Sequence, residues 1–256
     1  MTTLNGRHAL VTGGSRGIGA AIARELLLQG ARVTLLARDA SALLQAQEQL
    51  SALGQVHHVV ADVAERKQVE QALQQVGQQL GPLDILINNA GQVASAPFLN
   101  TGDELWQRML DVNLNGTYYC IQAVLSVMRE QGWGRIVNVA SSAGLRGYAY
   151  VAAYCAAKHG VVGLTRALAL ELESSGVTVN AVCPGYTDTP MLRTSIEQLA
   201  AKTGQDGETI LATLAAQNAR GRLLSPQEVA QAAVGFCLPD ATQRNGEIAD
   251  LDTLPA

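Results

Sequence analysis

A tyrosine and a lysine stand four residues apart in the stretch YCAAKHG, at Tyr154 and Lys158. Side chains at positions i and i+4 lie on one face of a helix, with Cβ atoms about 5–6 Å apart, so the ammonium can lie near the phenol. A free tyrosine has a pKa of about 10, and a nearby positive charge favours the phenolate. The pair predicts a phenol that exchanges protons near neutral pH. The alternative is an interfacial tyrosine and a solvated lysine, because so short a motif also occurs by chance.

A glycine-rich stretch, VTGGSRGIG at residues 11–19, follows an apolar run and opens a helical pattern. Gly13, Gly17 and Gly19 permit a tight turn, close approach of backbone to a pyrophosphate, and close packing of helix on strand. The helix N-terminus supplies N–H groups to the anion. In this strand–turn–helix context the glycines predict a dinucleotide site, and the alternative is a plain tight turn.

The cofactor's ribose is expected at the end of the second strand, where the sequence is LLARD. If the strand ends at Ala37, Arg38 can meet a 2′-phosphate and Arg16 can add a second cation, since arginine suits bidentate phosphate binding. We therefore predict NADP(H) as the preferred cofactor, with NAD possible. If the strand runs two residues further, Asp39 takes the ribose position and NAD is favoured. A third interpretation makes Arg38 a solvated surface charge.

These groups need a scaffold, and short apolar runs alternate with helical patterns along the chain. Strands are expected at 8–14, 32–37, 57–62, 84–91, 135–141 and 178–185, with a possible seventh at 246–252. Helices are expected near 17–29, 41–53, 65–80, 102–130, 151–174 and 225–238, the last with Ser225 as N-cap and Pro226 at its first position. Strands separated by helical crossovers predict an α/β fold, a doubly wound, Rossmann-like parallel sheet in a single domain over residues 1–256.

The segment 187–222 interrupts this alternation with polar and small residues after a strand. An excursion of this length at the carboxyl end of a strand is where a helical substrate lid would lie. The alternative is a surface helical hairpin without that role.

Composition limits the classes of function. A net charge of −4 and a pI near 5.6 do not suggest a nucleic-acid or anionic-membrane partner. Without an apolar N-terminal leader or a run of about 20 apolar residues, a cytoplasmic protein with a small-molecule substrate is expected. The four histidines have no ligand spacing, so no metal site is predicted. The scattered cysteines, Cys155 beside Tyr154 included, are expected to be reduced thiols.

Together, the motifs resemble the short-chain dehydrogenase/reductase family over residues 6 to about 240. The positions that match are Thr12, Gly13, Gly17 and Gly19 in the glycine turn, Asn88 to Gly91 (NNAG), Asn113 in DVNLNG, Ser141 in IVNVASSAG, Tyr154 with Lys158, and Thr189 in CPGYTDTP.

The resemblance implies a role for each of four polar residues. Tyr154 would be the general acid in ketone reduction and the general base in alcohol oxidation, with its pKa lowered by Lys158, which would also bond the nicotinamide ribose. Ser141 would hold the substrate oxygen, and Asn113 would support a water linking Lys158 to solvent. The adjacent Ser142 has the wrong spacing to Tyr154. Taken singly, such residues also end strands, cap helices or satisfy backbone groups, as Asn88 and Asn89 could.

Further cofactor contacts are implied in the loops that follow the strands. The full set is Gly13, Ser15, Arg16, Gly17, Ile18, Gly19, Arg38, Asp62, Val63, Asn89, Ala90, Gly91, Tyr154, Lys158, Pro184, Gly185, Thr187 and Thr189.

The C-terminal stretch NGEIADLDTLPA departs from the family pattern. It keeps Gly246 and Asp252 but has Thr253 and Leu254 where the family has a glycine pair. By analogy, a homotetramer or dimer is expected through the helices at 102–130 and 151–174.

Substrate is the least determined property. The stretch from 156 to 191 resembles bacterial β-oxoacyl-thioester reductases, hydroxyacyl-CoA dehydrogenases and polyketide ketoreductases, so a β-keto or β-hydroxy acyl thioester is predicted. Arg146 could reach an acidic group of the substrate or be a surface arginine. The alternatives are another ketone or secondary alcohol, such as a sugar, diol or steroid, and a cofactor-binding subunit without turnover.

Overall fold

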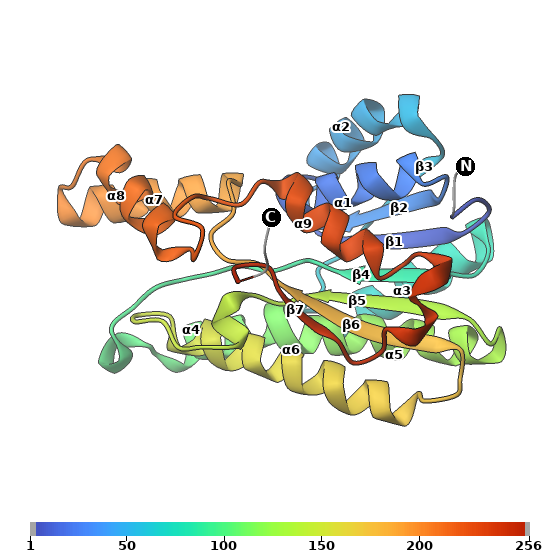
Figure 1. Cartoon of the computed structure of the whole chain (residues 1–256). Helices are drawn as coiled ribbons and strands as arrows, with labels where there is room; N and C mark the ends of the chain where they lie inside the picture. The colour runs from blue at the N-terminus through green and yellow to red at the C-terminus, as the bar shows by residue number, and fades with distance from the viewer. Residues whose placement is uncertain (1–3, 254–256) are drawn as a thin grey trace.

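The computed structural model describes residues 4–253 and contains a seven-stranded sheet of order β3-β2-β1-β4-β5-β6-β7 (Figure 1). Every neighbouring pair in the sheet is parallel. The strands are β1 His8–Thr12, β2 Arg32–Ala37, β3 Val56–Val60, β4 Ile85–Asn88, β5 Gly134–Val139, β6 Val177–Cys183 and β7 Ile248–Asp250. The predicted α/β, Rossmann-like fold in a single domain is confirmed, with strands trimmed where their last residues turn into loops.

Helices cover both faces of the sheet (Figure 1). They are α1 Gly17–Leu28, α2 Ala40–Leu50, α3 Arg66–Leu80, α4 Asp103–Leu110, α5 Gly116–Glu130, α6 Ala152–Glu171, α7 Pro190–Thr203, α8 Gly207–Gln217 and α9 Pro226–Gly235. The N-terminus of α9 is as predicted, with a reciprocal capping box between Ser225 and Glu228.

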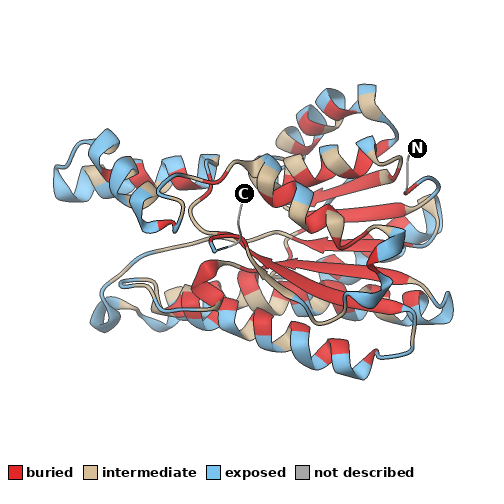
Figure 2. Ribbon diagram, in the orientation of Figure 1, coloured by how far each residue is buried: buried red, intermediate tan, exposed pale blue. Residues whose placement is uncertain are grey.

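Two apolar cores lie on opposite sides of the sheet, as the alternation of strand side chains requires. In β1, Ala9 and Val11 pack with residues of α1, α2 and α9, whereas Leu10 packs with residues of α3, α5 and α6. Because both faces are covered, the strands β1, β5 and β6 are buried from end to end (Figure 2).

The helical stretch expected over 102–130 is present as an unbroken helical run from Asp103 to Glu130, but it is not regular α-helix throughout. A π-helical turn, Asp111–Asn115, separates α4 from α5. Such a turn accommodates one extra residue and shifts the apolar positions by one along the sequence, a small irregularity in an otherwise helical pattern. It brings the wholly buried Asn113 to the end of the sheet where the NNAG segment lies.

The segment 187–222 is a helical hairpin, α7 and α8, which projects from the body of the protein (Figures 1 and 2). It has a small apolar cluster of its own, around Leu192, Ile196 and Ile210. Asn218 ties its far end back to the chain after β6, because its side chain accepts from the Tyr186 N–H at 2.8 Å and donates to the Tyr186 carbonyl at 2.8 Å. The hairpin is therefore anchored at both ends.

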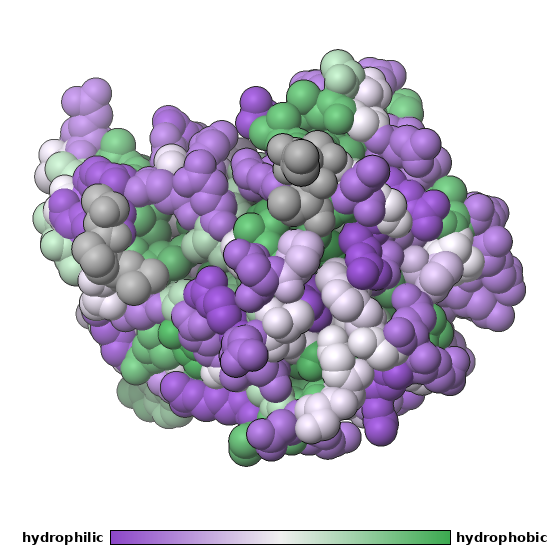
Figure 3. Space-filling model, turned by 45° about the vertical axis from the view of Figure 1, so that its right-hand side comes forward, coloured by the Kyte–Doolittle hydropathy of each residue, from purple (hydrophilic) through white to green (hydrophobic). Residues whose placement is uncertain are grey.

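The surface seen in Figure 3 is mostly hydrophilic, interrupted by hydrophobic areas. No helix within residues 4–253 combines the length and the apolar character that crossing a bilayer would demand.

Candidate active site

The ends of β1 and β4 are joined by the NNAG segment. The Thr12 hydroxyl accepts from the N–H groups of Asn89 at 2.9 Å and Ala90 at 3.0 Å. The Asn89 amide in turn donates to the carbonyls of Thr12 at 2.9 Å and Gly13 at 3.3 Å. Asn89 therefore does satisfy backbone groups, and these are the groups that shape the glycine loop.

Asn88 is the last residue of β4, and Ala90 and Gly91 follow in the next loop. Asn88 and Gly91 lie against different side chains. The Asn88 amide donates to the side chain of Asn138 on β5 at 2.9 Å, inside the sheet. Gly91 lies so close to two polar side chains that a Cβ there would be 2.9 Å from Asn113 Oδ1 and 3.7 Å from Lys158 Nζ. The NNAG segment thus reaches from the glycine loop to the lysine.

The glycine loop leaves no room for side chains at the positions that matter. Gly13 and Gly17 have φ values of 64° and 57°, which favour glycine. A Cβ on Gly19 would lie 2.2 Å from the Gly13 carbonyl oxygen, and one on Gly17 would lie 3.5 Å from Thr189. The phosphate loop and the start of the hairpin therefore face each other at short range.

The N-terminus of α1 fits a pyrophosphate. Arg16 occupies the N-cap position in an extended conformation and makes no side-chain cap. Thr189 is the cap of α7. A helix start with uncapped N–H groups behind a side-chain-free loop suits an anionic ligand. Ser15 and Ile18 belong to the same turn, as predicted.

The end of β2 bears on the two predicted ribose partners, Arg38 and Asp39. The strand stops at Ala37, and the Asp39 carboxylate accepts from the Ala42 N–H at 3.0 Å, so it caps α2. The side chain of Arg38 is 60% exposed and lies 3.5 Å from Asp62. Arg108 of α4 is also 3.5 Å from that carboxylate. The alternative in which a longer strand delivers Asp39 is therefore wrong.

The remaining predicted cofactor positions lie at the carboxyl ends of β3 and β6. Val63 packs against Gly116, at the first turn of α5. Pro184 accepts a 2.9 Å hydrogen bond from the Ser142 N–H, and the Thr187 hydroxyl donates to the Gly185 carbonyl at 3.1 Å. These loops and the glycine loop all lie at the carboxyl end of the sheet, because the strands that they follow are parallel.

Tyr154 and Lys158 lie in the first turns of α6. The Lys158 ammonium is 5.8 Å from the centroid of the Tyr154 ring and donates to the Val139 carbonyl at 2.8 Å. The lysine is only 4% exposed, so the alternative of a solvated surface lysine is wrong. The helix and the end of β5 together hold the ammonium beside the phenol.

The pKa of Tyr154 departs from expectation. Burial raises it to about 12, and the interaction with the Ser141 hydroxyl only partly opposes this. Burial also lowers the pKa of Lys158 to about 8. The predicted lowering of the tyrosine pKa by the lysine is thus absent from the protein alone, because desolvation disfavours the charged form of both groups.

Ser141 and Ser142 have different partners, which separates the two serines. The Ser141 hydroxyl accepts from the Ala143 N–H at 3.1 Å and lies close enough to Tyr154 to affect its pKa. Ser142 is buried, and its hydroxyl is 2.8 Å from the Tyr148 hydroxyl. This geometry agrees with the expectation that Ser141 is the serine facing the tyrosine.

Asn113 uses its side chain on backbone groups. Its oxygen accepts from the Gln92 N–H at 3.2 Å, and its amide donates to the carbonyls of Gln92 at 2.9 Å and Met109 at 3.0 Å. The π-helical turn therefore holds the chain that follows the NNAG segment, beside Lys158.

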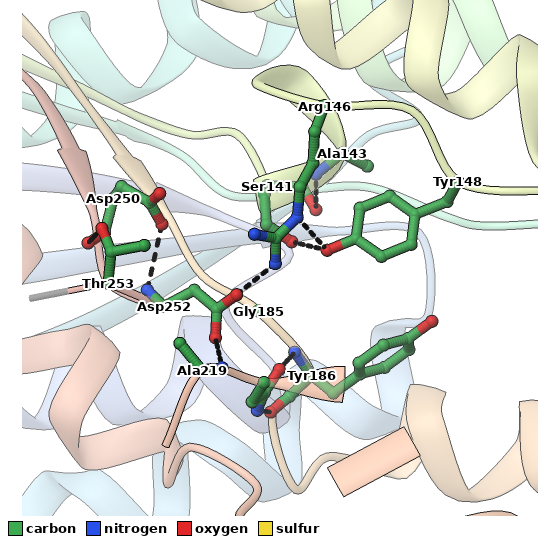
Figure 4. A network of polar contacts seen from close by, with 12 residues as sticks. Ser141, Ala143, Arg146, Tyr148, Gly185, Tyr186, Ala219, Asp250, Asp252 and Thr253 are labelled. Atoms are coloured by element: carbon green, nitrogen blue, oxygen red, sulfur yellow. Dashed lines mark hydrogen bonds and ion pairs between the residues drawn. The ribbon is translucent and has the colours of Figure 1, made fainter. Parts of the chain in front are cut away.

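The sequence did not predict the polar network that lies beside the two serines (Figure 4). The Arg146 guanidinium donates to the Tyr148 hydroxyl at 2.9 Å and forms an ion pair with the buried carboxylate of Asp252. Tyr148 meets Tyr186 edge-on, with ring centroids 6.2 Å apart. Arg146 is therefore a surface arginine, as one alternative held, but its charge is paired with Asp252. The only available signal was the retained Asp252 in a departing C-terminus.

Among residues 4–253, no group of three or more histidine, cysteine or acidic side chains could hold a metal ion. The cysteines Cys120, Cys155, Cys183 and Cys237 are buried free thiols. Of the departing C-terminal residues, Thr253 lies in a turn after β7, and Leu254 is outside the described residues.

Comparisons with known proteins agree with this geometry. Residues 7–200 match the family model described as short chain dehydrogenase. The chain is 41% identical over 243 residues to the monensin polyketide synthase putative ketoacyl reductase of Streptomyces virginiae, covering 94% of this chain and 93% of the relative. It is 36% identical over 254 residues to the D-beta-hydroxybutyrate dehydrogenase of Cupriavidus necator, covering 97% of each.

A solved structure extends the likeness to the fold. A variant of actinorhodin polyketide ketoreductase, crystallised with NADPH, superimposes with a TM-score of 0.93 at 36% identity, covering 98% of this chain and 97% of that chain. The chain therefore belongs to the short chain dehydrogenase family and is a nicotinamide-dependent oxidoreductase that acts on a carbonyl group or an alcohol.

Proposed function

We propose that this protein is an NADPH-dependent reductase of β-keto acyl thioesters. One observation carries the proposal. Tyr154, Ser141 and Lys158 lie together at the carboxyl end of the sheet, where the glycine loop follows β1. Relatives named as ketoacyl reductases support the acyl class. A reductase of another small ketone remains the alternative.

The nicotinamide cofactor supplies the hydride. Tyr154 donates a proton to the developing alkoxide, and Ser141 holds the carbonyl oxygen in reach of the phenol. Lys158, fixed by the Val139 carbonyl, places positive charge beside the phenol. Asn113 holds the backbone of Gln92 through two hydrogen bonds. It thereby fixes the adjoining Gly91, which lies between Asn113 and Lys158.

The protonation state of Tyr154 in the unliganded protein suits the reductive half of the reaction. With a pKa of about 12, the phenol carries its proton at neutral pH. A protonated phenol can act as the general acid that ketone reduction requires, whereas alcohol oxidation requires the phenolate as base. The protein alone is therefore prepared for reduction.

NADPH is preferred in this proposal because of the charges after β2. Arg38 is exposed and adjoins the strand end, while Asp39 is committed to the N-cap of α2. A guanidinium at this position attracts a 2′-phosphate, and the only acid that competes for it in the described contacts is Asp62. NAD remains a possible second cofactor.

The helical hairpin is assigned the role of substrate lid. It begins at Thr189, against Gly17 of the phosphate loop, and returns at Asn218, which is bonded to Tyr186. Its apolar cluster is small and its outer surface is exposed, which suits a segment that moves over a substrate. A homotetramer or dimer and a cytoplasmic location stay predictions.

The experiment is the initial rate of NADPH and of NADH oxidation with acetoacetyl-CoA. A rate with NADPH that exceeds the rate with NADH at least tenfold, and that Tyr154→Phe abolishes, would support the proposal. Turnover of sugars, diols or steroids but not of the thioester would replace the substrate class. Binding of NADPH without oxidation across a broad carbonyl panel would favour the subunit without turnover.

A further inference from the structure

The buried carboxylate of Asp252 is the starting point. Its side chain is 0% exposed, although it lies near the end of the chain. One oxygen accepts from the Ala219 N–H at 2.9 Å, and the other is paired with Arg146. A buried carboxylate without a cation would be very costly, so the Arg146 guanidinium is held where Asp252 requires it.

The Arg146–Asp252 pair adjoins the proposed substrate site. Arg146 donates to Tyr148, whose hydroxyl is 2.8 Å from Ser142, the neighbour of Ser141. Tyr186 packs edge-on against Tyr148 and is close enough to Tyr154 for their charges to interact. Figure 4 shows Arg146 between Tyr148 and Asp252, with Tyr186 on the chain below. One side chain, that of Tyr148, thus connects the guanidinium to Ser142, the neighbour of Ser141.

The guanidinium is still accessible from solvent, with 45% of its side chain exposed. A free β-keto acid that entered here would bring a second carboxylate to a cation already neutralised by Asp252. The two carboxylates would repel each other, and any displacement of Arg146 would leave Asp252 buried and unpaired. An uncharged acyl group incurs neither cost.

We propose that Asp252 is a specificity-determining residue that keeps Arg146 neutralised, so that the site accepts the uncharged acyl group of a β-keto thioester and rejects a free β-keto carboxylate. This inference rests on the proposed function. It separates two chemistries that the names of the relatives leave open, ketoacyl reduction and hydroxybutyrate oxidation.

The test compares two probes that differ in this charge, acetoacetate and the neutral acetoacetyl-N-acetylcysteamine thioester. Asp252→Asn keeps the size of the side chain and an oxygen for the Ala219 N–H, but it frees the charge of Arg146. Calorimetric titration of acetoacetate into each NADP⁺-saturated protein should give binding at least 10-fold tighter in Asp252→Asn than in wild type. The double variant Asp252→Asn/Arg146→Met should lose this gain.

Turnover provides the second readout. The ratio of kcat/KM for the thioester over acetoacetate should fall at least 10-fold in Asp252→Asn. Glu247→Gln is the matched control, because it removes an acid from an exposed arginine pair in the same C-terminal region and should leave both readouts unchanged. Equal acetoacetate affinity in wild type and Asp252→Asn, or a gain that survives in the double variant, would overturn the inference.

Two other results are possible, an absence of turnover with every probe and a failure of Asp252→Asn to fold. If no probe is turned over, the proposed thioester activity fails, but the calorimetric comparison still decides the role of Asp252. If Asp252→Asn does not fold, Arg146→Gln in the wild-type background is measured instead, because its amide can still donate to Asp252. Unchanged acetoacetate affinity then supports a neutralised Arg146, and a 10-fold loss shows that Arg146 already binds carboxylate and overturns the inference.

Discussion

The ammonium of Lys158 lies 5.8 Å from the centroid of the Tyr154 ring and donates a 2.8 Å hydrogen bond to the carbonyl of Val139. Val139 is the last residue of β5, so the sheet sets the position of the cation while α6 sets that of the phenol. Both groups are desolvated, and the pKa values of the two move in opposite directions, up for the tyrosine and down for the lysine. The cation and the proton donor are therefore held in place before any ligand binds.

Replacing the phenol should remove the proton donor and little else. We expect Tyr154→Phe to lower kcat about 10³-fold, within the range for loss of a general acid. The dissociation constant for NADPH, measured by fluorescence titration, should change less than about threefold. Tyr150→Phe is the matched control, since that tyrosine is 67% exposed on the preceding loop, and it should keep wild-type kcat. Comparable losses in the two variants would contradict the role of Tyr154.

The depressed pKa of Lys158 makes a prediction about stability and pH. Between pH 8 and 10.5 the unfolded chain binds a proton at this lysine that the folded protein does not, so its contribution to stability rises with pH and is lost as pH falls toward 8. Urea denaturation of the unliganded protein should show Lys158→Met with an advantage over wild type that shrinks by about 2 kcal/mol between pH 8 and pH 10. An advantage that does not change with pH would mean that the lysine is neither desolvated nor shifted.

The tight approach within the glycine loop is tested by a pair of glycine-to-alanine changes. Gly19→Ala places a methyl 2.2 Å from the Gly13 carbonyl oxygen and should cost about 1–3 kcal/mol of stability while weakening NADPH binding at least 10-fold. Gly77→Ala is the control, in an exposed turn of α3 with no atom within 4 Å of the added methyl. It should stabilise the protein by about 0.5–1 kcal/mol. Thermal denaturation and fluorescence titration measure both variants, and unchanged NADPH affinity in Gly19→Ala would argue against a cofactor at this loop.

The two residues after β2 should have separable effects. Arg38→Ala should raise the KM for NADPH at least 10-fold and leave the KM for NADH within about twofold, because only NADPH carries the 2′-phosphate. Asp39→Ala should cost about 1 kcal/mol through loss of the α2 cap and leave the ratio of the two KM values unchanged. A rise in the KM for NADH together with a fall in the KM for NADPH in Asp39→Ala would instead place the aspartate at the ribose.

Sequence alone was sufficient for the features whose causes are local. The glycine turn, the N-cap of α9 at Ser225 and the Tyr154–Lys158 spacing each depend on residues within one turn or loop. The sequence also predicted a parallel sheet, because strands that alternate with helices form β-α-β units. The family resemblance assigned the loops at Asn89, Ser141 and Pro184 to one site, and these loops follow strands whose carboxyl ends lie at the same end of the parallel sheet.

Tertiary structure decided what depends on packing and on distant partners. The rise in the pKa of Tyr154 follows from its burial, which no i, i+4 spacing encodes. The π-helical turn at Asn113 shifts the helical pattern by one residue, which the sequence alone does not distinguish from ordinary irregularity in the spacing of apolar residues. The pairing of Arg146 with Asp252 joins residues 106 positions apart, and only the folded chain brings a C-terminal carboxylate to the loop between Ser141 and Tyr154.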